Sequence, residues 1–156
     1  MKEQGPILVV AACIRKGGTI LLTQRNQSAS PHADQKWGLP GGKVHLEESL
    51  HEAVKREILE ELGAKISITR LLPHVQSNIY YDRTDPELPT LHAIVLAFVA
   101  LLQPDSSDPY PQEPGIKEVR WVSSKDLDSL ELLPGTKEFI HAVTNSGEAT
   151  YKEGMS

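Results

Sequence analysis

The sequence has few of the features that mark secreted, membrane-spanning or nucleic-acid-binding chains. It contains one cysteine, Cys13, so no disulfide can form within the chain, which fits a reducing compartment. No apolar stretch reaches the about 18 residues needed to cross a bilayer. The longest, His92 to Leu102, reads as a buried strand. The first residues lack the cleavage site of a secretory signal, so we expect a cytoplasmic protein with no membrane partner.

Positive charge is also scarce, because the 156 residues carry a formal net charge of −5. This balance argues against a polymeric nucleic acid as partner. It does not exclude a mononucleotide, because a bound cation neutralises a phosphate locally. The six histidines show no zinc-binding spacing. The length suits one domain with a sizeable core.

The chain does contain short apolar runs separated by turns, with eleven Gly and eleven Pro. Good helix formers fill Glu47 to Leu62, and Gly63 follows as a stop. Strands are predicted at residues 7–14, 19–24, 64–72, 74–81, 91–102 and 117–122, and shorter helices at 124–130 and 136–144. Residues 25–36, 82–89 and 103–115 are predicted loops, 37–42 a tight Gly/Pro segment, and 146–156 a fraying end. Strands with two or three helices indicate an α/β layered fold.

The predicted helix carries acidic residues beside its apolar face rather than opposite to it. At about 100° per residue, an apolar stripe from Leu50 to Leu62 should face the core. Glu57, Glu60 and Glu61 project beside or within the edge of this stripe. Like charges one turn apart repel each other, and removing them from water costs more. Angular position alone leaves two readings open: a Glu-rich helix surface, or oxygen ligands for Mg²⁺ or Mn²⁺.

The spacing around this helix decides between the two readings. The order is Gly42, five residues, Glu48, seven residues, Arg56-Glu57-Ile58, one residue, Glu60-Glu61, one residue, Gly63-Ala64. This matches the whole Nudix box, and a chance match is on the order of one in a million. The lead-in Trp37 to Gly42 also resembles the family, as does the strand that ends at Val122 before a short helix.

The resemblance to the Nudix family implies a fold and an activity. The expected fold is α/β, with a mixed β-sheet sandwiched between helices, in one domain over residues 1–156 with its core at about residues 6–145. The expected activity is hydrolysis of a diphosphate linkage in a compound built from a nucleoside diphosphate joined to another group. The expected cofactor is Mg²⁺, with Mn²⁺ as the alternative.

The same resemblance assigns roles to the acidic residues. It implies that Glu57, Glu60 and Glu61 bind divalent cations, joined by the carbonyl of Gly42. A water activated by the cations attacks the diphosphate. Either Glu57 or Glu60 acts as the base or orients this water, and the motif does not separate them.

In some relatives the base comes from a later loop instead. Glu113 and Glu118 are the candidates in this chain, and plain surface charge is the alternative for each.

Neighbouring residues are assigned supporting roles. Arg56 is expected to pair with Glu48 or to orient Glu57. The alternative is a solvated Arg that makes weak pairs with Glu52 and Glu60 along the helix. Gly41 is expected where the backbone approaches metal or phosphate closely. Lys43 is a candidate phosphate contact, against a solvated Lys.

Substrate choice is the least determined property. Tyr80 and Tyr81 are candidate substrate contacts, because some dinucleoside polyphosphate hydrolases of the family carry a Tyr near that distance from the box. The expected substrate is a nucleotide-like small molecule, by default a nucleoside triphosphate (a MutT-like hydrolase), with its nucleoside near loops 25–36 and 82–89. Dinucleoside polyphosphates, ADP-ribose and nucleotide sugars are the alternatives.

A non-catalytic domain that senses a nucleotide is the alternative from another functional class. The chain keeps every glutamate of the box, which favours the enzyme. A homodimer is left open.

Overall fold

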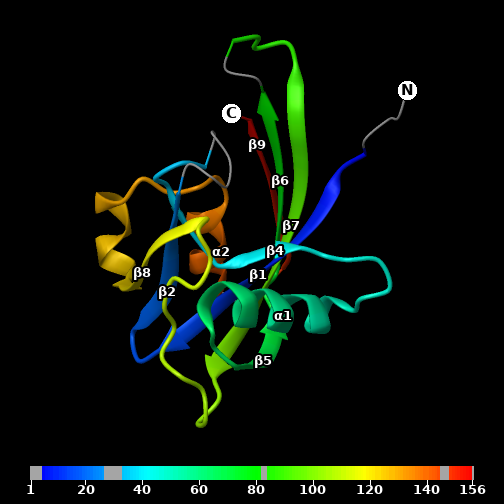
Figure 1. Cartoon of the computed structure of the whole chain (residues 1–156). Helices are drawn as coiled ribbons and strands as arrows, with labels where there is room; N and C mark the ends of the chain where they lie inside the picture. Colours follow the sequence, from blue (N-terminus) through cyan, green and yellow to red (C-terminus); the bar gives the residue numbers. More distant parts are fainter. Residues whose placement is uncertain (1–4, 27–32, 82–83, 145–147, 156) are drawn as a thin grey trace.

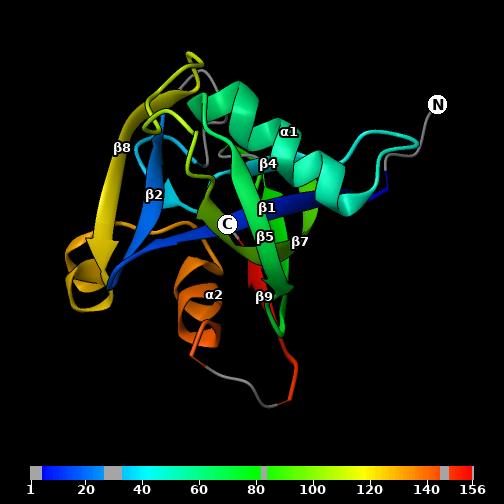
Figure 2. The same cartoon turned by 90° about the horizontal axis from the view of Figure 1, so that it is seen from below.

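The computed structural model describes residues 5–26, 33–81, 84–144 and 148–155 of the chain. In Figure 1 a long, twisted system of strands runs through the molecule, and Figure 2 shows α1 and α2 on opposite sides of strands β1 and β7. The fold is therefore a mixed β-sheet between helices, as the sequence predicted. Within the described ranges, no helix has the length and apolarity to cross a bilayer.

The described elements follow one another in a fixed order along the chain. They are β1 Ile7–Lys16, β2 Thr19–Arg25, β3 Trp37–Gly38, β4 Gly41–Lys43, α1 Leu50–Leu62, β5 Ile66–Leu71, β6 His74–Tyr81, β7 Pro89–Leu102, β8 Ile116–Ser123, the 3₁₀ helix η1 Ser124–Ser129, α2 Thr136–Ala142 and β9 Thr150–Met155.

Strand β1 organises the sheet, because it pairs with three other strands. It runs parallel to β7 from the pair Ile7–Ala93 to the pair Ile14–Ala100, and antiparallel to β2 and β4. The strand order is β3-β2-β1-β7-β6-β9, with β4 also joined to β1, β5 to β7, and β8 to β2. The pairing with β4 matters for the site, since it fixes the lead-in to α1 against the middle of the sheet.

Side chains of β1 alternate between two hydrophobic cores. Val10, Ala12 and Ile14 pack in the core beneath α1, and Ala11 and Cys13 pack in the core beneath α2. This is the period-two pattern of a strand that is covered on both faces.

Helix α1 begins later than the sequence predicted, at Leu50 rather than Glu47. Ser49 is the N-cap: its hydroxyl accepts from the Glu52 amide, and the Glu52 carboxylate accepts from the Ser49 amide. Glu47 has a φ of 65°, which no helix allows. The capping box therefore stops the helix short of residues that have good helix propensity.

Other boundaries differ by smaller amounts, and one prediction was wrong. The predicted fraying end forms strand β9 over residues 150–155. The tight segment 37–42 contributes to the two short strands β3 and β4. Residues 27–32 and 82–83 of the predicted loops, and residues 145–147 and 156 near the end, lie outside the described parts of the chain.

Candidate active site

Two glycines let strand β4 approach its neighbours closely, Gly41 on the side of β1 and Gly42 on the side of α1. A Cβ atom on Gly41 would collide with the backbone of Val10 and Ala11, and one on Gly42 would collide with the carboxylate of Glu57. Both positions therefore need glycine because of close approach. The backbone of β4 at Gly42 therefore passes directly beside the carboxylate of Glu57 on α1.

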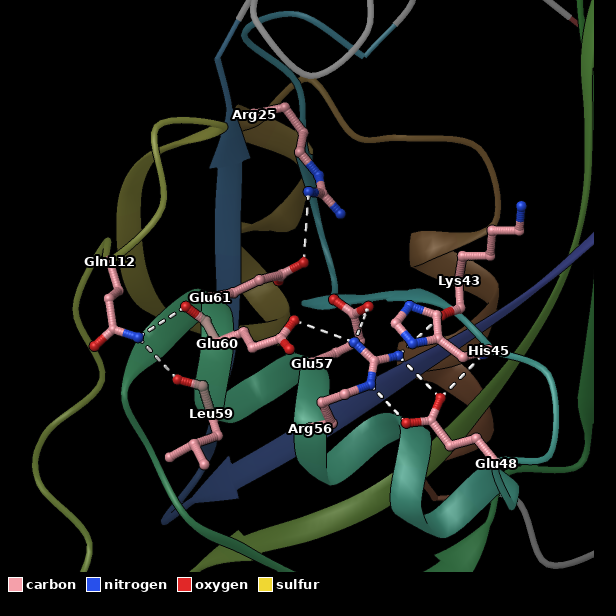
Figure 3. A network of polar contacts seen from close by, with 10 residues as sticks. All are labelled: Arg25, Lys43, His45, Glu48, Arg56, Glu57, Leu59, Glu60, Glu61 and Gln112. Carbon is pink, nitrogen blue, oxygen red and sulfur yellow. Dashed lines mark hydrogen bonds and ion pairs between the residues drawn. The ribbon is translucent and has the colours of Figure 1, made fainter.

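Arg56 is the centre of a charged network on α1, shown in Figure 3. Its Nε and Nη2 donate to the two carboxylate oxygens of Glu48, at 2.6 and 3.0 Å. Its Nη1 donates to Glu57 at 2.9 Å and Glu60 at 3.1 Å, and Nη2 also donates to the Lys43 carbonyl at 3.1 Å. Five N–H donors thus meet five acceptors.

This geometry settles how Arg56 is placed. It is a fixed fork, not a solvated side chain, and its bonds to Glu48 are bidentate. Hydrogen bonds from Arg56, helped by the His45 amide, lower the pKa of Glu48 to about 2. The Glu48 bonds also raise the pKa of Arg56. Arg56 therefore ties the loop before α1 to the acidic face of the helix.

Glu61 occupies the most unusual position, because it is only 4% exposed. Among the described residues, its Oε2 atom has no hydrogen-bond partner. The nearest cation is Arg25 of β2, whose Nη1 lies 3.9 Å from Oε1, and Figure 3 shows the two side chains pointing toward each other. Burial raises the pKa of Glu61 to about 8; Arg25 opposes the rise, and Glu57 and Glu113 add to it. A buried carboxylate of this kind costs stability unless a positive charge reaches it.

The acidic cluster fits a divalent cation by its chemistry. Glu61 offers a buried oxygen without a partner, Glu57 lies against the Gly42 backbone, and Glu60 is half exposed. Hard oxygen donors of this kind suit Mg²⁺ or Mn²⁺. Across the described ranges no three acidic, histidine or cysteine side chains already converge as ligands of one ion. Glu57 and Glu60 instead share Nη1 of Arg56, so a cation would have to draw them away from it.

The loop after β7 closes the far end of α1. The side-chain Nε2 of Gln112 donates to the backbone carbonyls of Leu59 and Glu60, and the backbone amide of Gln112 donates to the carbonyl of Glu61. The Tyr110 amide donates to the carbonyl of Leu62. The last carbonyls of a helix normally lack partners. Here the loop satisfies them, and so fixes the turn that carries the acidic residues.

The two candidate late-loop bases lie in different surroundings. Glu113 follows Gln112, and its charge raises the pKa of Glu61, so it lies close to the acidic cluster. Glu118 lies on β8 and pairs with Arg120, at 2.9 Å, with both side chains about half exposed. The placement favours Glu113 over Glu118 as a group that acts at the cluster.

A pocket of about 250 Å³ opens beside the cluster, on the α2 side of β1. Most of its wall is apolar, including Val9, Leu39 and Phe139, as is common for small-molecule sites. Its polar lining includes Arg25, Asn78 and Tyr80, and Gly41 also borders it. The pocket therefore adjoins the acidic cluster through two residues, Arg25 and Gly41.

The structure places the four predicted substrate contacts differently. Gly41 and Tyr80 line the pocket, and burial raises the pKa of Tyr80. Lys43 has an exposed side chain, and Tyr81 is half-buried. Neither belongs to the lining formed by the described residues.

Comparison with known proteins assigns the family. A family model described as the NUDIX domain matches residues 5–143, which is most of the chain. The chain belongs to the Nudix family. The box predicted at residues 42–64 is thus the family motif, and the enzyme is a Nudix pyrophosphohydrolase.

Individual Nudix proteins share this architecture over most of their length. An 8-oxo-dGTP diphosphatase of Haemophilus influenzae is 32% identical over 140 residues, which cover 89% of this chain and 92% of that protein. The nucleoside triphosphatase NudI of an Enterobacter strain is 28% identical, over 83% and 90% of the two chains. A crystal structure of a MutT Nudix hydrolase from Burkholderia pseudomallei is 29% identical, with a TM-score of 0.72, over 90% of this chain and all of that one.

Three residues of the candidate site were not singled out from the sequence, although the loop that begins at Arg25 was expected near the nucleoside. Arg25 comes from β2, Asn78 from β6 and Gln112 from the loop after β7. None belongs to the box, and each reaches the site only through the pairing of strands or the packing of a loop. For Arg25, the available sequence signal was that a charged residue stands at the end of a predicted hairpin strand.

Proposed function

We propose that this Nudix enzyme is a Mg²⁺-dependent pyrophosphohydrolase of nucleoside triphosphates, including oxidised ones. The observation that carries the proposal is the Glu61 carboxylate. It is buried, and its Oε2 has no hydrogen-bond partner in the described structure. Arg25 beside it also lines the adjoining pocket. A cation at the cluster and a nucleoside in the pocket would place a phosphate chain between them.

The protein's own groups have distinct tasks in this proposal. Glu57, Glu60 and Glu61, with the Gly42 carbonyl, would hold the cation. When bound, the cation neutralises charge on the phosphate oxygens and lowers the pKa of a water. Arg56 holds Glu48 and the lead-in loop in place. Arg25 would contact a phosphate, because it lies between the pocket and Glu61.

The proton of the attacking water would pass to Glu57 or Glu60. Of the two side chains, that of Glu60 is the more exposed, with an exposed fraction of 48% against 13% for Glu57. The adjacent Glu113 is the alternative base.

The names of the relatives support a triphosphate substrate. The two relatives compared by sequence are named a nucleoside triphosphatase and an 8-oxo-dGTP diphosphatase. The pocket beside the acidic cluster is also modest in volume, at about 250 Å³, which suits one nucleoside. A dinucleoside polyphosphate is the second candidate, because Tyr80 lies in the pocket and presents an aromatic face for a base.

A phosphate-release screen tests the proposal. Nucleoside triphosphates, ADP-ribose, nucleotide sugars and dinucleoside polyphosphates are incubated with the protein and Mg²⁺, and in parallel with EDTA. We expect the highest kcat/KM for a nucleoside triphosphate and no turnover with EDTA. Tight nucleotide binding without hydrolysis of any compound would point instead to a sensing domain.

A further inference from the structure

Strand β9 lies beyond the part of the chain that the family model matches, which ends at residue 143. It pairs in parallel with β6, from His74–Thr150 to Ile79–Met155. Figure 1 shows it beside β6 at the border of the sheet. The residues Thr150, Lys152 and Gly154 stand opposite His74, Gln76 and Asn78 in this pairing.

The three β6 residues form a buried ladder of polar side chains. His74, Gln76 and Asn78 are 2%, 1% and 4% exposed. The Thr150 hydroxyl lies 2.6 Å from His74 Nδ1, and His74 Nε2 lies 2.9 Å from Gln76 Oε1. Gln76 Nε2 donates to Asn78 Oδ1 at 2.8 Å. The ladder therefore runs from β9 along β6 toward the pocket.

The ladder fixes how the Asn78 amide is turned. Asn78 Nδ2 donates to the carbonyl of Pro134 at 3.0 Å, and a carbonyl can only accept. Its Oδ1 must then accept, and it does so from Gln76. The orientation of one amide thus determines that of the next, back to the His74 ring.

Asn78 is the member of the ladder that reaches the pocket, where it and Tyr80 are both lining residues. A hydrogen bond from Asn78 opposes the rise of the Tyr80 pKa that burial causes. The two groups are therefore coupled. Side-chain amides match the donor and acceptor edges of nucleobases. A site whose polar groups are fixed discriminates more strongly between such edges than an apolar pocket does.

Gly154 of β9 presses against this end of the ladder. A Cβ atom there would lie 2.6 Å from Asn78 Oδ1 and 3.1 Å from Pro134 Cβ. The strand thus touches both Asn78 and the carbonyl-bearing residue that orients it.

We propose that β9 is part of the apparatus that selects the nucleobase. It acts as a positioning element that holds the Asn78 amide, and through it Tyr80, in one orientation on the pocket wall. This inference rests on the proposed function, because it takes the pocket as the nucleoside site. It assigns substrate selection to a segment outside the matched family domain.

Two variants test the proposal from different sides. Gly154→Ala adds a methyl group that displaces the side-chain amide of Asn78. Gln76→Met removes the Nε2 donor to Asn78 Oδ1 while it keeps the length of the side chain. Tyr151→Phe is the control, since Tyr151 lies on β9, is exposed, and its hydroxyl donates to Glu153 rather than to a residue of the ladder. Melting temperatures are measured first, so that selectivity is compared between folded proteins.

The first readout is kcat and KM for the triphosphates of each base. We expect KM for the preferred base to rise about tenfold in both ladder variants, the size of one hydrogen bond, while kcat changes less than about threefold. The preference over the second-best base should fall by a similar factor. Tyr151→Phe should keep the wild-type preference. Unchanged preference in the folded ladder variants would overturn the proposal.

The second readout separates this proposal from the proposed function. Binding of nucleoside monophosphates is titrated by tryptophan fluorescence with EDTA present, so that no hydrolysis is required. Loss of base preference in this binding supports the role of β9 even if the wild-type protein hydrolyses no triphosphate, in which case only the proposed substrate fails. Hydrolysis by all variants with unchanged base preference in both readouts refutes the role of β9 and leaves the enzyme assignment intact.

Discussion

At the scale of single residues, the proposed cation ligand Glu61 lies in a position that is unfavourable for folding. Its carboxylate is buried near Glu57 and Glu113, and Arg25 compensates it only from 3.9 Å. A surface glutamate would not carry this cost, and neither would one held by a close arginine. We therefore expect Glu61 to destabilise the metal-free fold, and the proposed cation would remove that cost.

Glu61→Gln tests this interpretation. We expect turnover to fall by about two to three orders of magnitude and Mg²⁺ affinity to weaken, because a charged ligand is lost. The metal-free protein should keep its stability or gain up to about 1 kcal/mol, because repulsion within the cluster is relieved. Activity assays are combined with melting curves in EDTA and in Mg²⁺.

The control for this substitution is Glu131→Gln, an exposed glutamate outside the cluster. It should change neither activity nor melting temperature by much. A large loss of metal-free stability in Glu61→Gln would show that Glu61 supports the fold, and unchanged activity would exclude its metal role.

Arg56 gives a second prediction at this scale. Arg56→Lys keeps the charge but loses the planar fork that binds Glu48 through two bonds. We expect kcat/KM to fall by at least about tenfold, because Glu48 and the Lys43 carbonyl lose partners. Equal activity of Arg56→Lys and wild type would mean that charge alone is needed at this position.

From the sequence it could be predicted that Glu57, Glu60 and Glu61 lie near one another, whereas the positions of other residues of the candidate site could not be predicted. Glu57, Glu60 and Glu61 follow from spacing along one helix, where three and four residues bring side chains to one face. Arg25 and Asn78 could not be found in this way. Their distance from the cluster is set by which strands pair, and a pattern of local spacing contains no such information.

At the scale of elements, the two ends of α1 are held by different means. The N-terminus is closed by its own capping box of Ser49 and Glu52. The C-terminus has a local cap at Gly63, and a distant loop adds to it, because Gln112 binds the carbonyls of Leu59 and Glu60. The capping box lies in the local sequence and explains why the helix starts at Leu50. The loop contact depends on the tertiary fold, so the sequence could not predict it.

Gln112→Ala and Ser49→Ala form a matched pair for this element. Each should destabilise the protein by about 1 kcal/mol, because each removes capping hydrogen bonds. Only Gln112→Ala should also weaken Mg²⁺ binding by a few fold, because it loosens the turn that carries Glu60 and Glu61. Calorimetric titration with Mg²⁺ and thermal melts separate the two effects. Equal losses of Mg²⁺ affinity in both variants would show that helix stability alone matters.

The end of the chain illustrates another limit of prediction at the element scale. Residues 150–155 have little apolar character of their own, which favoured an unstructured end. They nevertheless form β9, because the border of the sheet at β6 offers unpaired backbone groups. Pairing with an existing strand can therefore order a segment whose composition does not itself favour a strand.

At the scale of the whole molecule, the two cores share the strand β1. Cys13 lies at its centre and is fully buried in the core beneath α2. Burial raises the pKa of its thiol to about 12, so the thiol stays protonated at neutral and mildly alkaline pH. The thiol can be exposed only if this core opens, because the side chain projects from the face of the sheet that α2 covers.

This makes Cys13 a reporter of global unfolding. At pH 8 a thiol reagent should react with the native protein at a rate that follows the population of unfolded chains, and at the rate of a free thiol in denaturant. The reaction is followed by absorbance over a series of denaturant concentrations. Rapid labelling of the native protein, without a matching loss of structure, would contradict the buried position.

The fork of Arg56 has a consequence for how the enzyme exists before it meets a cation. Its Nη1 contacts Glu57 and Glu60, two of the carboxylates that would become ligands, while its bonds to Glu48 and Lys43 stand apart from them. In the metal-free protein Arg56 thus acts as an internal counterion for these carboxylates, so that the strongly acidic face of α1 can fold without a cation from solution. Binding of the proposed cation would then replace one positive charge by another. The strength of the Arg56 contacts therefore sets how favourably a cation would have to bind before Glu57 and Glu60 exchange Arg56 for it.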